Sequence, residues 1–485
     1  MRFATSFAAI AFLVVGLCLA TPITPSASHW TGQATAHFAI FTTQDAAGRQ
    51  DLLARLERTR LFFEKMGWPA HDLKRPLRIL AFSSEKEFED YAPIPAAFAF
   101  YQRTREGDFV LMRPLEPENY PAVMHEYTHF IVEHSGLQLP LWLNEGLADF
   151  YSTLESREGQ VAVGMAPRGR EETLRCNAWM DWQQLTAVDH GSPYYQELNK
   201  MLLFYSQSWA LVHVLALNTD YESKFHGFLT ALSANSTAED PWSATYHRSL
   251  REMGSQAQQE FTANKLKPRV FDLDIRPGAL QSAEAADPTE QTEFALAAVL
   301  AANPKKLGEA KVRFEILAAK YPDDPRPAES LGVLSWGAGQ KGDAEREFEL
   351  AVKNHSHDPE ILFLLAHLKL AHDSTDEAIG LLQQALAVNP EYYNALVELG
   401  FAAAKNQNFQ LAAATLGKIA ECRPEHAFQV SYTLAYSLSE LNQTNRARGV
   451  AEQSWKLASN AHDKQQATEL LAYIQHEAKE EGATQ

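Results

Sequence analysis

Hydrophobic residues in the first third of the chain alternate in some segments and recur at helical spacing in others. Residues 37–43 alternate and are rich in β-forming side chains, so they predict a strand. Short β-rich runs over 78–82 and 109–112 predict two further strands. Between the first two strands, leucines and phenylalanines three and four residues apart predict a helix over 51–66, which Gly67 ends.

Helical spacing dominates from residue 120 onwards. A short helix is expected over 83–91, and a longer one over 120–134 with Pro121 in its first turn and Gly136 just past its end. The pattern over 137–261 is mostly helical, with polar loops between the segments. Strands followed by a series of helices predict a domain of the α+β class.

A change of composition separates this first domain, residues 29–264, from the rest of the chain. Residues 265–290 mix Pro, Asp, Ala and Glu without periodicity, which predicts a linker. Residues 291–480 are again strongly helical and carry an internal repeat.

In the repeat, a Leu-Gly or Leu-Ala pair is followed twelve residues later by an alanine. The copies are Leu331-Gly332 with Ala344, Leu365-Ala366 with Ala378, Leu399-Gly400 with Ala412, Leu434-Ala435 with Ala447, and a weaker first copy with Ala298 and Ala310. Prolines at 325, 359, 390 and 424 share this period, and each is expected to end the second helix of its copy. The pattern resembles the tetratricopeptide repeat, a pair of antiparallel helices per ~34 residues. The resemblance implies an all-α solenoid whose concave groove binds a protein partner.

Composition limits the number of domains, the classes of partner and the kinds of cysteine site. With 485 residues and 46% hydrophobic side chains, the chain has room for two or three globular domains. A formal net charge of -18 makes non-specific binding of nucleic acid unfavourable, because an acidic surface repels phosphates. The cysteines, Cys18, Cys176 and Cys422, are too few and too scattered for a disulfide framework or a Cys-x-x-Cys site.

The N-terminal segment has the features of an export signal. Arg2 precedes an apolar run, residues 7–20, and a polar stretch rich in Pro, Ser and Thr follows over 21–28. The run is short for a bilayer span, so residues 1–28 predict a cleaved signal peptide and a periplasmic or secreted protein without a remaining membrane span. An uncleaved N-terminal anchor is the alternative.

The predicted helix 120–134 contains a His-Glu-x-x-His motif. Residues four apart share one face of a helix, so His125 and His129 can reach the same ion. Glu126 projects about 100° around the helix from His125, beside the ion, where it can take a proton from an activated water. The motif therefore predicts a zinc-dependent hydrolase with Glu126 as general base.

A third ligand follows the motif. Catalytic zinc takes three protein ligands and leaves a position for water. The segment 141–150, LWLNEGLADF, contains Glu145, which becomes the third ligand if the segment is helical. Asp149 lies one turn further on the same face, where it can bind the free ring nitrogen of a ligand histidine. Two histidines and one carboxylate favour zinc over calcium or magnesium.

These motifs together resemble the gluzincin metallopeptidases. The separation of His129 and Glu145 is closer to the exported peptidase-MA-like family, in which WLNEGLA follows the zinc helix. The resemblance covers roughly residues 35–260. It implies that His125, His129 and Glu145 hold Zn²⁺ and that Glu126 is the general base. It also implies that Asn144 and Asp149 support the ligands.

The same resemblance extends to the segment that starts at Tyr205. Related peptidases carry a tyrosine at a similar distance after the glutamate ligand, and it donates to the oxyanion of the tetrahedral intermediate, so Tyr205 is expected in that role. The Gly-x-Met-Glu-Asn segment that grips the free amine in related aminopeptidases is missing between residues 95 and 120. Cleavage inside a peptide or protein is therefore expected rather than removal of N-terminal residues.

Two other functions remain compatible with the sequence. The first is a non-catalytic repeat scaffold that retains a peptidase fold without its activity. The second is a zinc hydrolase that acts on another bond, such as a cell-wall crosslink.

Overall fold

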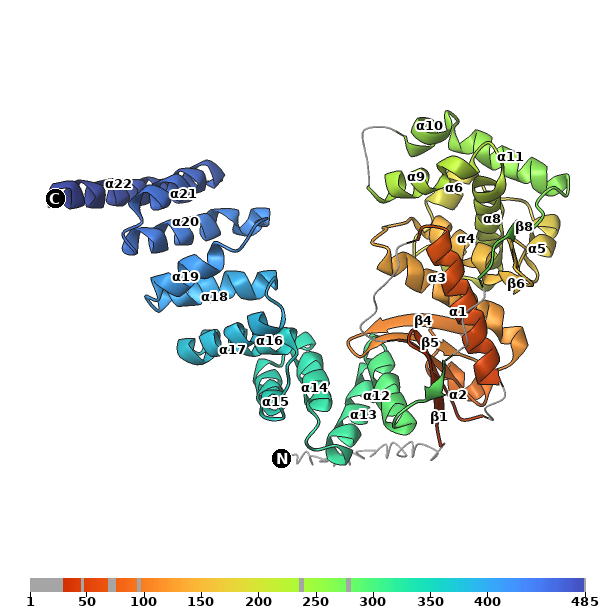
Figure 1. The fold of residues 1–485 in the computed structure, drawn as a ribbon, viewed down its shortest axis with the longest axis horizontal. Coiled ribbons are helices and arrows are strands. Elements are labelled where there is room, and N and C mark those ends of the chain that lie inside the picture. The colour runs from red at the N-terminus through yellow and green to blue at the C-terminus, as the bar shows by residue number, and fades with distance from the viewer. Residues whose placement is uncertain are drawn as a thin grey trace, which may run out of the picture.

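The computed structural model describes residues 29–44, 48–68, 76–93, 97–234, 240–275 and 281–483, with side chains to residue 476. Figure 1 shows a domain of mixed strands and helices from which a curved row of helical hairpins extends to the C-terminus. The predicted signal segment, residues 1–28, lies outside the described residues. Among the residues that are described, no helix has both the length and the apolar character needed to cross a bilayer.

The domain is built around a mixed sheet. In the described ranges six strands form it, in the order β4-β5-β3-β2-β1-β9. The central strands β2 (Phe38–Thr42), β3 (Leu77–Ala81) and β5 (Gly107–Met112) pair in parallel. The outer strands β1 (Thr31–Ala34), β4 (Ala99–Thr104) and β9 (Ala283–Glu284) pair antiparallel with their neighbours, and β4 lies at an edge.

Successive side chains of the central strands point to opposite faces of this sheet, and helices cover both faces. On one face, Ile40 and Ile79 join a core with helices α1 (Arg49–Lys65) and α3 (Tyr120–His134). On the other face, Phe41 and Leu80 pack with α2 (Glu85–Glu89) and with a helix from the repeat region, α12 (Pro288–Ala301). The strands and helices predicted for residues 37–134 are confirmed. Strands β1 and β4 were not predicted.

Beyond α3 the domain is mainly helical. A 3-10 turn, η2 (Pro117–Asn119), leads into α3, and the long apolar helix α8 (Leu198–Leu217) is the centre of the helical layer. The remaining helices are α4 (Leu141–Ser152), α5 (Arg170–Cys176), α6 (Trp182–Thr186), α7 (Pro193–Gln196), α9 (Glu222–Ser233), α10 (Pro241–Tyr246) and α11 (Leu250–Thr262).

The segment 265–290 is part of the fold and differs from the expected linker. It contributes β8 (Arg269–Asp272), which pairs with β7 (Gln160–Val163) of the hairpin formed with β6 (Glu155–Arg157). It also contributes β9 at the edge of the main sheet. These strands are too short to show periodicity, and backbone pairing with a distant partner defines them. The segment therefore ties the first domain to the repeats.

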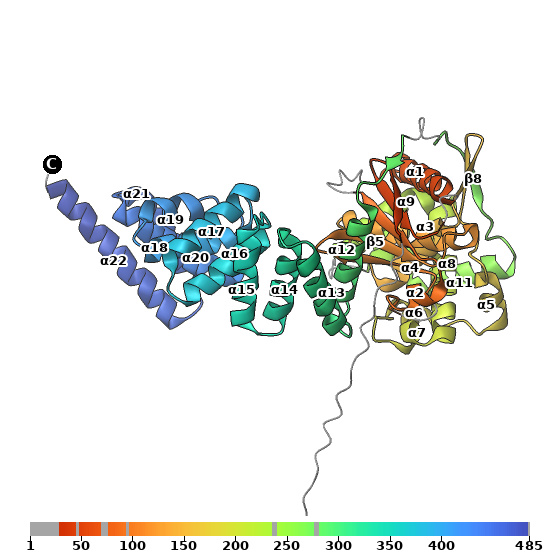
Figure 2. The same cartoon turned by 90° about the horizontal axis from the view of Figure 1, so that it is seen from below.

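The predicted repeats are confirmed as antiparallel helix pairs. In the described part of the chain the pairs are α12 with α13 (Leu307–Lys320), α14 (Pro325–Gly337) with α15 (Lys341–Lys353), α16 (Pro359–Ala371) with α17 (Thr375–Val388), α18 (Tyr393–Lys405) with α19 (Phe409–Leu416), and α20 (Pro424–Glu440) with α21 (Thr444–Leu457), followed by α22 (Ala461–Ala483). A Cβ atom at Gly332 would lie 2.4 Å from Phe348, and one at Gly400 would lie 2.3 Å from Leu416. Small residues thus let the helices of a pair approach closely. Figure 2 shows the stack running from α12, beside the sheet, to α22.

Three of the four prolines have a different role from the predicted one, whereas Pro390 directly follows the end of α17, as predicted. Pro325, Pro359 and Pro424 each lie in the first turn of the helix that begins the next pair, instead of ending the helix before it. Proline is favoured there because the missing N–H would have no acceptor. The side chains of Asp324 and Asp358, just before two of these prolines, accept backbone N–H groups at the helix starts.

Candidate metal centre

Two helices of the first domain bring together the predicted ligands. His125 and His129 lie four residues apart on α3, and Glu145 lies in the second turn of α4. The Nε2 atoms of the histidines are 3.1 Å apart, and Glu145 Oε2 lies 3.2 Å from that of His125 and 3.4 Å from that of His129. One atom of each residue lies within 4.8 Å of the others, so the trio can hold a single metal ion.

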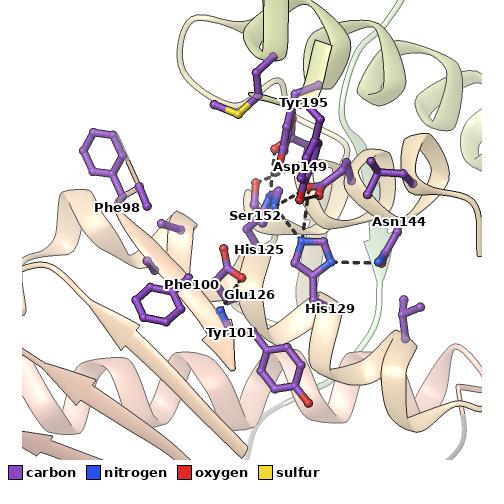
Figure 3. A pocket seen from close by; sticks show the side chains of 18 of the residues that line it. Phe98, Phe100, Tyr101, His125, Glu126, His129, Asn144, Asp149, Ser152 and Tyr195 are labelled. Atoms are coloured by element: carbon purple, nitrogen blue, oxygen red, sulfur yellow. Dashed lines mark hydrogen bonds and ion pairs between the residues drawn. The ribbon is translucent and has the colours of Figure 1, made fainter. Parts of the chain in front are cut away.

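The other ring nitrogen of each histidine is held by α4. His125 Nδ1 lies 3.1 Å from Asp149 Oδ1, and His129 Nδ1 lies 3.1 Å from Asn144 Oδ1 (Figure 3). Because Nδ1 donates to these oxygens, Nε2 is left with a lone pair that faces Glu145. Asn144 and Asp149, which were expected to support the ligands, each contact a different histidine.

A close approach of two helices fixes the position of Glu145. A Cβ atom at the next residue, Gly146, would lie 2.6 Å from Val212 Cγ2 and 2.8 Å from the Ser208 carbonyl of α8. A larger side chain would push α4 away from α8 and move the carboxylate of Glu145 with it. The glycine in the LWLNEGLADF segment is explained by this contact.

An arginine that the sequence analysis did not single out completes the support of His125. Arg170, the first residue of α5, donates from Nε to Asp149 Oδ2 at 2.6 Å and from Nη2 to Oδ1 at 3.2 Å. The Asp149 side chain is buried, and the Arg170 side chain is mostly shielded from solvent. Although burial opposes it, the charge of Arg170 holds the pKa of Asp149 below its usual value. No motif marks Arg170, because its partner lies twenty-one residues away on another helix.

The charges of the site are balanced locally. Burial alone would lower the pKa of His125, but the hydrogen bonds that its protonated ring donates to Asp149 and Glu145 raise it to about 10. Burial would raise the pKa of Glu145, but the charges of His129 and His125 hold it well below its usual range. Protons and a metal ion compete for the same lone pairs, so metal binding here releases protons.

Glu126 lies beside the trio and faces the cleft. Its Oε2 accepts a hydrogen bond of 2.9 Å from the backbone N–H of Tyr101 on β4. Figure 3 shows its carboxylate between β4 and the two histidines. Burial raises the pKa of Glu126, which makes the carboxylate a better proton acceptor than an exposed one.

Two tyrosines cover the other side of the site. The ring of Tyr205 stacks on that of His125, with centroids 6.0 Å apart, and the ring of Tyr195 stacks on Tyr205 at 6.4 Å. Tyr195 also donates from its hydroxyl to Glu145 Oε1 at 3.2 Å. Tyr205 was predicted near the site. Tyr195, from the short helix α7, was not predicted, since nothing in its local sequence distinguishes it from a surface aromatic residue.

The centre lies at the floor of a cleft of about 660 Å³. The edge strand β4 forms one wall with Phe100 and Gln102, together with Phe98 just before it, and the loop before α4 contributes Leu137 and Leu139. The lining thus combines apolar side chains with a compact polar group at the metal centre, as substrate-binding clefts do.

Comparison with known proteins identifies the C-terminal part. Residues 369–435 match the tetratricopeptide-repeat family. A similar solved structure, YrrB, is described as a TPR protein with an unusual peptide-binding site. It has 15% identity and a TM-score of 0.32, and the match covers 38% of this chain and 92% of that one. MamA matches at 17% identity and a TM-score of 0.27, over 32% and 89%. A thermophilic TPR protein in Thermus thermophilus matches at 19% identity and a TM-score of 0.23, over 38% and 99%.

No curated protein sequence matches the chain. The C-terminal part is a tetratricopeptide-repeat array, the kind of scaffold that generally binds proteins. These comparisons carry no support for peptidase activity, so the interpretation of the metal centre depends on its geometry alone.

Proposed function

We propose that the chain is a zinc-dependent peptidase that cleaves bonds inside peptides or proteins, with a repeat array that binds a protein. The observation that carries the proposal is the convergence of His125, His129 and Glu145, with the far nitrogen of each histidine held by a residue of α4. A chance arrangement of polar residues on two helices would not orient both rings toward one carboxylate.

The donor set fits zinc. Two imidazole nitrogens and one carboxylate oxygen form the three-ligand pattern of catalytic zinc sites. Zinc in such a site acts as a Lewis acid that activates water and polarises a carbonyl. The buried Asp149, paired with Arg170, keeps His125 in the tautomer that binds a metal.

The neighbouring side chains supply the proton transfers. Glu126 is held through Oε2 by the Tyr101 N–H, so its other oxygen can accept a proton from water and deliver it to the leaving amine. The Tyr195 hydroxyl contacts the ligand Glu145 and the Tyr205 ring stacks on the ligand His125, so either tyrosine is a candidate to donate to an oxyanion. Of the two, Tyr195 has its hydroxyl in direct contact with a ligand.

The edge strand of the sheet favours an extended peptide as substrate. Backbone groups of an antiparallel strand alternate between its partner and its free side. Since the Tyr101 N–H points away from β5 to Glu126, the outward groups of β4 face the cleft. An extended segment can add to this edge by main-chain hydrogen bonds and place a peptide bond beside Glu126.

A non-catalytic scaffold is the second candidate, and the comparisons favour it through the repeat match. In that case the array would bind its partner and the first domain would serve as a rigid base. The retention of Glu126 in the cleft supports catalysis instead, because a scaffold does not need a general base beside a metal site.

The proposal includes export, based on the signal-like residues 1–28. Fractionation of cells that express the full chain, with N-terminal sequencing of the product, tests this part. A mature N-terminus near residue 21 or 29 outside the cytoplasm is expected, and an intact Met1 in the cytoplasm would contradict it.

The test of catalysis compares Glu126→Gln with a matched control, Glu118→Gln. Glu118 is an exposed glutamate just before the same helix. Cleavage of unfolded casein and of end-blocked peptides is expected to fall by at least ~100-fold in Glu126→Gln and to persist in the control. Wild-type protein that binds zinc but leaves both substrates intact would favour the scaffold.

A further inference from the structure

The hairpin that carries the edge strand reaches out to the repeat array. Arg105, at the turn between β4 and β5, donates from Nη2 to Asp358 Oδ2 at 2.8 Å and forms a second ion pair with Glu360. Asp358 caps α16 and Glu360 lies in its first turn, so both carboxylates belong to the third helix pair of the array. Arg105 is about one quarter exposed, which shields these pairs in part from solvent.

A second contact lies next to the first. Glu106, the neighbouring residue of the turn, is buried, and its carboxylate is 4.0 Å from Arg326 of α14. Arg326 in turn binds Asp324 and Glu290, each at 2.6 Å. The tip of the hairpin therefore meets two successive helix pairs, while α12 of the first pair packs on the face of the sheet. The hairpin and the array are held together at several points.

The same strand contributes to the metal centre. Tyr101, four residues before Arg105 on β4, donates its N–H to the general-base candidate Glu126. Four residues of strand span about 13 Å. A strand at the edge of a sheet has a neighbour on one side alone, so anchoring its far end limits its movement. The array is thus linked to the cleft wall through a short, nearly straight segment.

We propose that the ion pairs of Arg105 with Asp358 and Glu360 position the edge strand for catalysis, so that the repeat array controls the geometry of the cleft. This inference rests on the proposed peptidase function. Arg105 is a positioning residue, because it acts through β4 and touches neither the ligands nor the cleft lining. A protein that binds the array near the start of α16 would change the cleavage rate through this connection.

The test begins with Arg105→Gln in the full-length chain. Amide hydrogen exchange over residues 99–104 is expected to speed up by about three- to tenfold, and kcat/KM for casein to fall by a similar factor, at unchanged zinc content. Arg346→Gln is the matched control, since Arg346 forms an exposed ion pair with Asp343 inside the array. It should leave both quantities as in the wild type.

A double-mutant cycle separates positioning from a general structural effect. In an Asp358→Asn/Glu360→Gln background, the cap of α16 is kept but both charges are gone. Adding Arg105→Gln to that background should change little. High salt should mimic the variant in the wild type and have little effect on Arg105→Gln. Equal effects of Arg105→Gln in both backgrounds, or unchanged exchange in residues 99–104, would overturn the proposal.

The exchange measurement also keeps the two proposals apart. If the wild type shows no cleavage, the proposed peptidase function fails, and hydrogen exchange still reports whether the array holds β4. If cleavage is present and exchange in residues 99–104 ignores Arg105, the positioning role fails and the peptidase function stands.

Discussion

Replacing Asp149 by Asn separates the two tasks of that carboxylate, since it binds both a ligand histidine and a buried arginine. Asn keeps the shape of the side chain and an oxygen that can still accept from His125 Nδ1. It removes the negative charge opposite the Arg170 guanidinium, whose Nε lies 2.6 Å from Asp149 Oδ2. The variant therefore leaves a cation in the interior without its partner.

The magnitude follows from burial. Removing one partner of a buried ion pair costs about 3–5 kcal/mol. The Arg170 side chain keeps 16% exposure, which places the expected loss at the lower end, about 3 kcal/mol. For a domain of this size that loss lowers the thermal midpoint by about 6–12 °C. Loss of the charged partner of a metal-binding histidine weakens zinc affinity by about tenfold or more.

A second substitution tells these effects apart. In Asp149→Asn/Arg170→Met the uncompensated cation is gone, so the stability of the chelator-treated protein should return most of the way toward wild type. Zinc affinity, measured by competition with a chromophoric chelator, should remain low because His125 still lacks its carboxylate. Unfolding of Asp149→Asn at the wild-type midpoint, or full zinc affinity in the double variant, would show that Asp149 does not have these two roles.

Three further predictions concern pH dependence and packing. Because burial raises the pKa of Glu126 in the metal-free site, its carboxyl group should titrate above the usual range of a glutamate when metal-free protein is followed by NMR over a pH series. Titration at or below pH 4.5 would contradict this. Burial lowers the pKa of His213 to about 4, below its unfolded value of 6.5. The folded protein therefore binds this proton less readily than the unfolded chain. The free energy of unfolding should fall by up to about 3 kcal/mol as the pH drops from 6.5 toward 4. Urea unfolding of metal-free protein at several pH values should show this fall in wild type and not in His213→Gln. Gly146→Ala should lower the free energy of unfolding by about 1–3 kcal/mol and weaken zinc binding, because the added methyl group pushes α4 away from Val212. Gly227→Ala, on an open helix surface, is the control and should be neutral or stabilising. Thermal unfolding and zinc titration of both variants check this.

The sequence predicted the helices whose apolar period and boundary residues lie close together along the chain. Helix α3 has the predicted bounds, because its apolar period and its proline and glycine boundaries all lie within fifteen residues. The helix pairs of the array were predictable because each small residue recurs at the same place in successive copies. Three of their four prolines were assigned to the wrong helix, since the sequence alone gives a boundary without saying on which side of it proline lies.

Pairing between distant segments explains what the sequence did not predict. Strands β8 and β9 have no pattern of their own and form because β7 and β1 offer free edges. The second half of strand β4, residues 102–104, is polar and not buried, so the segment does not stand out as a strand in the sequence. Each of these strands is defined by its pairing with another strand and not by a pattern in its own residues.

The candidate site divides in the same way. The spacing of His125 and His129, and of Asn144, Glu145 and Asp149 on the next helix, follows from helical geometry and could be stated beforehand. Arg170 and Tyr195 reach the site from separate short helices, so neither could be found from spacing. The ion pairs of Arg105 join two domains, and no local signal in a turn predicts such a partner.

In the proposed function, a zinc ion held by two histidines and one glutamate serves peptide cleavage through Glu126. The most direct test of this function is a titration of zinc into metal-free wild type and metal-free Glu126→Gln, with bound zinc and casein cleavage measured on the same samples. Both proteins are expected to bind about one zinc per chain, and cleavage is expected to rise with zinc in the wild type alone. Cleavage that is independent of zinc, or equal in both proteins, would contradict the proposed function.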